Sequence, residues 1–372
     1  MTGRLLSLDA FRGLTLAAMI LVNNAGDWGH VFGPLRHARW HGWTMADLIF
    51  PSFVFIMGAA VPLALGRRIV EGESRTRVLG SVLRRTVILL LIGFLLNLLP
   101  LCDFSAVRVP GVLQRLALCY LSVSLVFLAS RRSVPWGVAA LALMGAHWAV
   151  LALAPVPGYR PGVLEPEGNA AWYIDSRLFA GHTYGHAPVP GFDPEGFLGT
   201  LSAAASAIFG MLAGAWMLRE RTAQERFRGL FAAANGMLVA GLVMDSFMPI
   251  NKNLWTPAFA VFTAGFALYF LLVCFWVMDV KRWLRPVTPF VALGANALAI
   301  YVLSSLVAKT LVAITVAGPG GKALSLKTVI FATLFASWME PYTASLGFAM
   351  VYLFLWGAVA VFLCWRNIFI RV

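Results

Sequence analysis

About ten segments of this 372-residue chain are long and apolar enough to cross a lipid bilayer as α-helices. Such a helix needs roughly 17–25 predominantly apolar residues. We place these segments, by residue number, at approximately 6–25, 45–65, 83–101, 111–130, 134–154, 196–218, 228–248, 255–278, 288–312 and 345–365. The residues are 60% hydrophobic and only 12% charged, whereas a soluble domain carries about 25% charged residues. The sequence therefore predicts an all-α polytopic transmembrane bundle that forms one domain over residues 1–372.

The basic residues predict how this bundle is oriented. The net charge is +13, but Lys and Arg occur in short clusters between the apolar segments. That placement indicates membrane orientation and does not favour nucleic-acid binding. With the N-terminus inside, about two thirds of the Lys and Arg residues fall on the inner side, as the positive-inside rule requires. Both termini are therefore expected in the cytoplasm, and the arginine-rich inner loops are typical of a bacterial inner (plasma) membrane protein.

Three segments need separate interpretation. Residues 154–194 form a long outer loop rich in proline, glycine and aromatic residues, which suggests an ordered lid or binding surface. Residues 325–340 are apolar but short, and are interpreted as interfacial or re-entrant, with an eleventh span as the alternative. The first apolar stretch is interrupted by Asp9 and Arg12, so it is expected to be an uncleaved helix and not a signal peptide.

Polar residues in the first helix are candidates for function, because an ionisable side chain in a span costs about 2.5–3.5 kcal/mol. Asp9 and Arg12 are three residues apart and can pair on one helix face. They either fix helix packing or present Arg12 to an anionic ligand from the cytoplasmic side. Asn23, at the outer end, is either a helix cap or a donor to a developing oxyanion.

The loop after this helix contains His30, His37 and His41. A histidine here is a general base or nucleophile, or an interfacial residue among the neighbouring tryptophans. Although His37 and His41 have a spacing seen in metal sites, Gly42 and the lack of a third ligand argue against zinc, and no metal is expected. Asp47 begins the second helix and either orients such a histidine or caps the helix.

Further polar residues occur near the ends of later helices. Arg108 and Arg115 lie near an outer helix end, against the positive-inside bias, and so require a function or a buried partner. The other members of this set are Asp193, Glu195, Lys252 and Asn296.

Five motifs in this chain, in the order LDAFRG, HARWHGWTMADLIFPSFVFIMG, VRVPGVLQRL, DPEGFLGT and INKNLW, resemble those of the heparan-α-glucosaminide N-acetyltransferase family and its bacterial relatives. The resemblance runs from about Arg4 to the C-terminus. It implies an enzyme that takes acetyl-CoA from the cytoplasm and acetylates the amine of a terminal glucosamine on the opposite side. The long N-terminal region and the extra first helix of the lysosomal member have no counterpart here. A bacterial relative acting on a small amino sugar is therefore expected.

The resemblance also suggests roles for individual residues. It makes His37, rather than His41, and Asn23 the catalytic residues. We expect acetyl-CoA to be bound by a set of mostly basic residues, Asp9, Arg12, Arg84, Arg85, Arg115 and Asn296, with Arg68 as a further candidate for phosphate. We expect the amino sugar or glycan end to be bound by Asp47, Asp193, Glu195 and Lys252. His37 would act either as a base in direct transfer or as an acyl acceptor.

Two other classes of function remain as alternatives. An amino-sugar permease would also need many helices and an outer polar cluster, but the sequence shows no internal repeat and no pair of broken helices. A receptor or scaffold would not explain the buried charges. The sequence leaves open whether the chain forms a homodimer.

Overall fold

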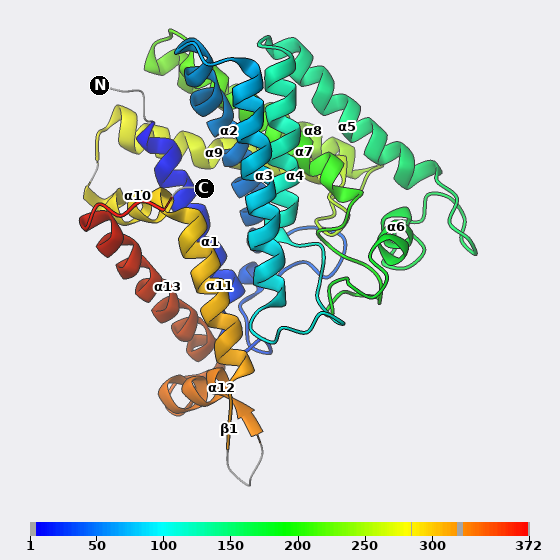
Figure 1. Cartoon of the computed structure of the whole chain (residues 1–372), viewed down its shortest axis with the longest axis vertical. Helices are drawn as coiled ribbons and strands as arrows, with labels where there is room; N and C mark the ends of the chain where they lie inside the picture. The colour runs from blue at the N-terminus through cyan, green and yellow to red at the C-terminus, as the bar shows by residue number, and fades with distance from the viewer. Residues whose placement is uncertain (1–4, 284, 318–322, 371–372) are drawn as a thin grey trace.

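The computed structural model describes residues 5–283, 285–317 and 323–370, and these form a bundle of long helices (Figure 1). Among the described residues, nine helices are long and apolar enough to span a membrane, and one bent pair brings the number to ten. The helices are α1 (Leu6–Asn23), α2 (Ile49–Val70), α3 (Arg75–Leu98), α4 (Val112–Ala129), α5 (Ser133–Leu153), α6 (Ala170–Leu178), α7 (Gly199–Leu218), α8 (Ala223–Asp245), α9 (Pro257–Phe275), α10 (Thr288–Ala295), α11 (Ala297–Ala313), α12 (Leu326–Phe331) and α13 (Pro341–Trp365). The predicted multi-pass membrane bundle is confirmed.

Short elements complete the chain. Single turns of 3-10 helix cover Gly33–Leu35, Met45–Leu48 and Arg285–Val287, and π-helical turns cover Trp276–Val280 and Ala332–Ala336. A two-stranded antiparallel hairpin pairs β1 (Thr315–Ala317) with β2 (Ala323–Ser325). In Figure 1 this hairpin and α12 lie at the end of the bundle farthest from the N-terminus.

Two segments in the last third of the chain, 288–312 and 325–340, do not form single spanning helices. The segment predicted as one helix over 288–312 is broken, because α10 and α11 meet at an angle of 83°. The break falls at Asn296, whose backbone leaves the helical conformation (φ −119°). Residues 325–340 contain a helix of only 11 residues, Leu326–Ala336, which is too short to span a membrane. The eleventh span is therefore excluded.

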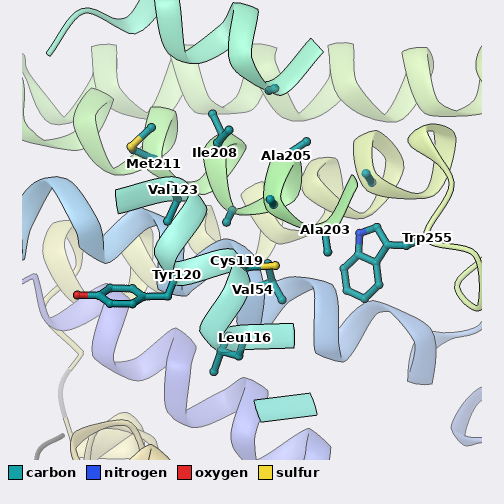
Figure 2. Close-up of a cluster of buried hydrophobic side chains, with 14 of the residues drawn as sticks. Val54, Leu116, Cys119, Tyr120, Val123, Ala203, Ala205, Ile208, Met211 and Trp255 are labelled. Atoms are coloured by element: carbon teal, nitrogen blue, oxygen red, sulfur yellow. The ribbon is translucent and has the colours of Figure 1, made fainter. Parts of the chain in front are cut away.

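The helices approach one another through small residues, as expected where lipid provides no hydrophobic force between them. A Cβ atom on Gly58 of α2 would lie 1.8 Å from the carbonyl oxygen of Ala207 in α7, so these backbones are in contact. Larger side chains from α2, α4 and α7 fill the space around this contact, including Val54, Cys119 and Met211 (Figure 2). Helices α1, α2, α7 and α9 are mostly buried, whereas α3, α5, α8 and α13 expose apolar faces that suit lipid contact.

Candidate active site

The loop after α1 brings His37 against Asp47. Asp47 lies in the 3-10 turn that precedes α2 and is fully buried. His37 Nδ1 is 2.8 Å from Asp47 Oδ1, and because a carboxylate only accepts, the hydrogen must be on Nδ1. This bond fixes the ring and leaves Nε2 as the nitrogen that can accept a proton. The side chain of His37 is 43% exposed, so a reactant can reach it.

Both roles suggested for Asp47, orienting a histidine and capping a helix, are present in the structure. Its second oxygen, Oδ2, accepts hydrogen bonds from the backbone N–H groups of Ala38 and Thr44, each at 3.0 Å. Thr44 and Asp47 also form a capping box. Because its oxygens are occupied in this way, Asp47 positions His37 and does not itself face a substrate.

Lys252 reaches the same site from the loop before α9. Its Nζ lies 3.2 Å from Asp47 Oδ1, and 2.9 Å and 3.4 Å from Nδ1 and Nε2 of His37. The two loops are joined where the N–H of Gly42 donates to the carbonyl of Ile250 at 2.8 Å. Gly42 has φ +89°, a conformation that favours glycine. Lys252 therefore places a positive charge beside the imidazole of His37.

Arg108 is paired with two carboxylates, those of Asp193 and Glu195. It donates from Nε and Nη2 to both carboxylate oxygens of Asp193, at 2.8 and 2.5 Å, and also contacts Glu195. Burial raises the pKa of Glu195, but the charges of Arg108, Arg115 and Lys252, together with the hydrogen bond from Arg108, outweigh this effect and hold that pKa below its usual value. Asp193 is buried, and both of its carboxylate oxygens accept hydrogen bonds from Arg108. Glu195, in contrast, lines the cavity described below.

Arg115 lies near the cluster of Arg108, Asp193 and Glu195 and not with Arg12. It is almost completely buried, and its Nη2 donates to the carbonyl of Gly196 at 3.0 Å. A Cβ atom on Gly196 would lie 1.7 Å from Asp175 Oδ2, so only glycine fits between this loop and α6. Burial raises the pKa of Asp175 to about 7. The expected grouping of Arg115 with the acetyl-CoA residues is therefore not observed, because its helix position faces α7.

Four of the predicted site residues line one small cavity at the end of the bundle where α1 finishes. The cavity has a volume of about 100 Å³, and Asn23, His37, Glu195 and Lys252 contribute to its wall. Asn23 is exposed at the end of α1, and within the described residues no hydrogen bond occupies its amide. An exposed amide, an oriented imidazole and an ammonium therefore face one space.

A second cavity of about 380 Å³ lies farther along the same helices, toward the end where α1 begins. Asp9 and Arg12 of α1, Arg85 of α3 and Tyr120 of α4 contribute to its wall, together with apolar residues of α2. The predicted ion pair is confirmed, with Arg12 Nη1 3.2 Å from Asp9 Oδ1. The guanidinium of Arg85 lies 4.8 Å above the ring of Tyr120. This cavity offers two guanidinium groups and an apolar wall.

Three other residues expected to contact acetyl-CoA are placed differently. Asn296 is buried, donates to the carbonyl of Ile368 at 3.0 Å and accepts from the N–H of Ile370 at 2.9 Å. Its amide therefore holds the C-terminal segment beside the cavity. Arg84 is exposed and does not line the cavity, and Arg68 is bound to Glu73 at 2.7 Å.

The sequence did not identify Thr44, Asn251 and Asp175, which support the site. Asn251 Nδ2 is 3.2 Å from His41 Nδ1, and its Oδ1 accepts from the N–H of Leu254. Two neighbouring glycines were the available signal, because Gly42 adopts a positive φ and Gly196 leaves room for the carboxylate of Asp175. In the part of the chain that the structure describes, no three His, Cys, Asp or Glu side chains gather closely enough to hold a metal ion.

Comparison with known proteins identifies the family. Residues 4–162 match the family "Heparan-alpha-glucosaminide N-acetyltransferase, catalytic". Arg4, where the resemblance begins, lies outside the residues that the structure describes. The chain is 34% identical over 351 residues to heparan-alpha-glucosaminide N-acetyltransferase of Homo sapiens, covering 80% of this chain and 52% of the human protein. The Mus musculus protein of the same name is 32% identical over 354 residues, covering 80% and 53%.

The chain belongs to the heparan-alpha-glucosaminide N-acetyltransferase family. It spans about half the length of the curated relatives it matches. The family match includes α1, α2, the His37 loop and the residues of α3 and α4 that line the second cavity.

Proposed function

We propose that this chain is a transmembrane acetyltransferase that moves an acetyl group from cytoplasmic acetyl-CoA to the amine of a glucosamine-like sugar at the outer face. We place it in a bacterial inner membrane, with both termini in the cytoplasm. One observation carries the proposal. The basic inner cavity and the His37 cavity are lined by the same three helices, α1, α2 and α4, one above the other.

The spacing along these helices supports a connection between the cavities. On α4, Leu116 lines the inner cavity and Val112 the outer one, a separation of about 6 Å at 1.5 Å per residue. On α2, Phe53 and Phe50 are about 4.5 Å apart along the axis. Roughly one helical turn of side chains therefore separates the two spaces. A flexible thioester arm, bound at its phosphates by Arg12 and Arg85, would cross that turn to reach His37.

The outer residues fit the chemistry of this transfer. The acceptor nitrogen attacks the thioester carbonyl, so that a C–N bond forms and the C–S bond breaks. His37 Nε2 takes the proton that the amine loses, and the departing thiolate of CoA receives it. Asn23 donates to the oxygen on which negative charge develops, an interaction of about 3–4 kcal/mol in comparable sites. The positive charge of Lys252 disfavours an ammonium beside it and so keeps the acceptor amine nucleophilic.

The first test is binding of acetyl-CoA to the purified protein, followed by release of free CoA with and without glucosamine. We expect CoA release that depends on the amine. His37→Ala should lower kcat by about 10²–10⁴-fold with little change in acetyl-CoA affinity. His186→Ala, an exposed histidine of the outer loop, is the matched control. Full activity of His37→Ala would refute its role, and rapid CoA release before any acceptor is added would indicate an acyl-histidine route.

A permease is the second candidate, and the break between α10 and α11 favours it. The sequence shows no pair of broken helices, which counted against a transporter, but the 83° bend is one such break. A permease need not bind acetyl-CoA. If the protein fails to bind acetyl-CoA and proteoliposomes containing it take up glucosamine, the permease replaces the acetyltransferase.

A further inference from the structure

A third cavity, of about 550 Å³, lies beside the proposed active site at the outer ends of α1, α3, α11 and α13. Its wall is mainly apolar, and includes Leu98, Leu99, Leu311, Val312 and Phe348. A space of this size is typical of binding sites for organic ligands and is much larger than the cavity at His37. The mechanism proposed above makes no use of it.

Two lysines are the charged groups of this cavity. Lys309 of α11 donates to the carbonyl of Leu96 at 2.5 Å, and Lys327 of α12 donates to the carbonyl of Ala25 at 2.7 Å. Both side chains are half-buried, and each ammonium retains two further hydrogens to donate. No aspartate or glutamate is among the described residues that line the cavity. The cavity is therefore positively charged within an apolar wall.

The acidic group that acts on Lys327, Asp27, does not neutralise this charge. Asp27 acts electrostatically on Lys327, but its Oδ2 lies 2.6 Å from His30 Nδ1 and its Oδ1 accepts from the N–H of Gly29. Burial lowers the pKa of Lys327, and Asp27 only partly opposes this effect. An anion bound beside Lys327 would stabilise its charged form.

The surroundings of the cavity face lipid. Leu91 and Leu95 of α3 are 56% and 51% exposed, and Leu303 and Val307 of α11 are 41% and 40% exposed. These side chains flank the cavity on the helices that form two of its walls. An amphiphile with an apolar chain can therefore enter from the bilayer, whereas a free sugar would gain nothing from such a wall.

The cavity also adjoins the proposed reaction centre. Asn23, the residue assigned to the thioester oxygen, lines this cavity and the His37 cavity alike. A ligand held by the two lysines would therefore present its other end to Asn23 and His37.

We propose that this cavity binds the anionic lipid portion of a lipid-linked amino sugar, with a phosphate between Lys309 and Lys327 and the sugar amine directed to His37. This inference rests on the proposed acetyltransferase function and names its acceptor class. The apolar wall accommodates the first part of the lipid chain, and the lysines recognise the phosphate.

The binding test uses radiolabelled dodecyl phosphate and immobilised full-length protein in dodecyl maltoside, so that neutral amphiphile is always in excess. We expect saturable binding that inorganic phosphate does not displace at equal concentration. Lys309→Gln and Lys327→Gln should each weaken binding at least tenfold, and Lys327→Arg should restore most of it. Lys281→Gln, on an exposed inner residue, is the control. Displacement by inorganic phosphate alone, or equal binding to the glutamine variants, would overturn the inference.

The kinetic test compares glucosamine with glucosamine joined through a phosphate to a dodecyl chain. We expect the KM of the lipid-linked acceptor to be at least tenfold lower, and this advantage to be lost in Lys309→Gln and Lys327→Gln. CoA release with glucosamine but no lipid advantage would refute this inference and leave the proposed function standing. Lysine-dependent binding of dodecyl phosphate without CoA release from either acceptor would refute the acetyltransferase and leave an anionic-lipid site.

Discussion

Replacing Asp47 by asparagine removes one charge from the proposed site while keeping the shape of a fully buried side chain. The environment decides how the new amide must lie. The Oδ2 position already receives the N–H groups of Ala38 and Thr44, so an NH₂ group cannot occupy it. The amide nitrogen must therefore take the Oδ1 position, facing His37 Nδ1 and Lys252 Nζ.

This orientation predicts a large loss of activity. The amide nitrogen is a donor, so His37 Nδ1 becomes the acceptor and its proton moves to Nε2, where the base is needed. The equivalent change in serine proteases, which produces the wrong tautomer, lowers kcat by about 10⁴-fold. We expect Asp47→Asn to lower kcat by about 10²–10⁴-fold, equivalent to roughly 3–5.5 kcal/mol.

The assay is CoA release at saturating acetyl-CoA and glucosamine, with acetyl-CoA affinity measured in parallel. Affinity should stay within about threefold, because Asp47 does not line the inner cavity. Thr44→Val is the matched control, since it removes one bond to Oδ2 and leaves Oδ1 unchanged, and it should alter kcat by less than about fivefold. A folded Asp47→Asn protein that retains more than a tenth of the wild-type kcat would refute the assigned tautomer.

Three further predictions concern other parts of the structure. Arg12→Ala should weaken acetyl-CoA binding about tenfold or more in a titration, because Arg12 lines the inner cavity. Arg84 does not line that cavity, so Arg84→Ala should leave the affinity unchanged. Equal affinities of the Arg12→Ala variant and the wild type would remove Arg12 from the phosphate site. The pKa of Asp175 is raised to about 7 in the folded state, so the stability of the protein declines as pH rises from about 4 to 7. Asp175→Asn should make the thermal unfolding midpoint less dependent on pH over that range. A pH dependence of the midpoint equal to that of the wild type would contradict this prediction. Gly294→Ala should sharply reduce the yield of folded protein in size-exclusion chromatography, since its Cβ would lie 1.9 Å from the carbonyl of Asp9. Gly357→Ala is the control, because a Cβ atom at Gly357 would have no neighbour within 4 Å. Equal yields of the two variants would exclude a close contact of α1 with α10.

Much of the fold follows from the sequence because the relevant forces are local. The apolar content of each segment determines whether it can remain in lipid, so spans such as 6–25 and 345–365 could be placed from their residues alone. The exception is 288–312, which is predominantly apolar and was predicted as one helix, but is broken at Asn296, whose side chain binds the backbone at residues 368 and 370. That partner is more than 70 positions away, and no local pattern reveals it.

The sequence by itself determined the membrane bundle and the residue types from which a reaction centre could be built. Only the tertiary structure decided which of them converge. Lys252 meets His37 across 215 positions and Arg108 meets Asp193 across 85, whereas Arg115 faces the carbonyl of Gly196 and does not join Arg12. The hydropathy of a segment is a sum over neighbouring residues, so it can be calculated from the sequence alone. The meeting of two side chains depends on how helices pack and rotate, which is fixed by contacts such as those of Gly58 that act between distant parts of the chain.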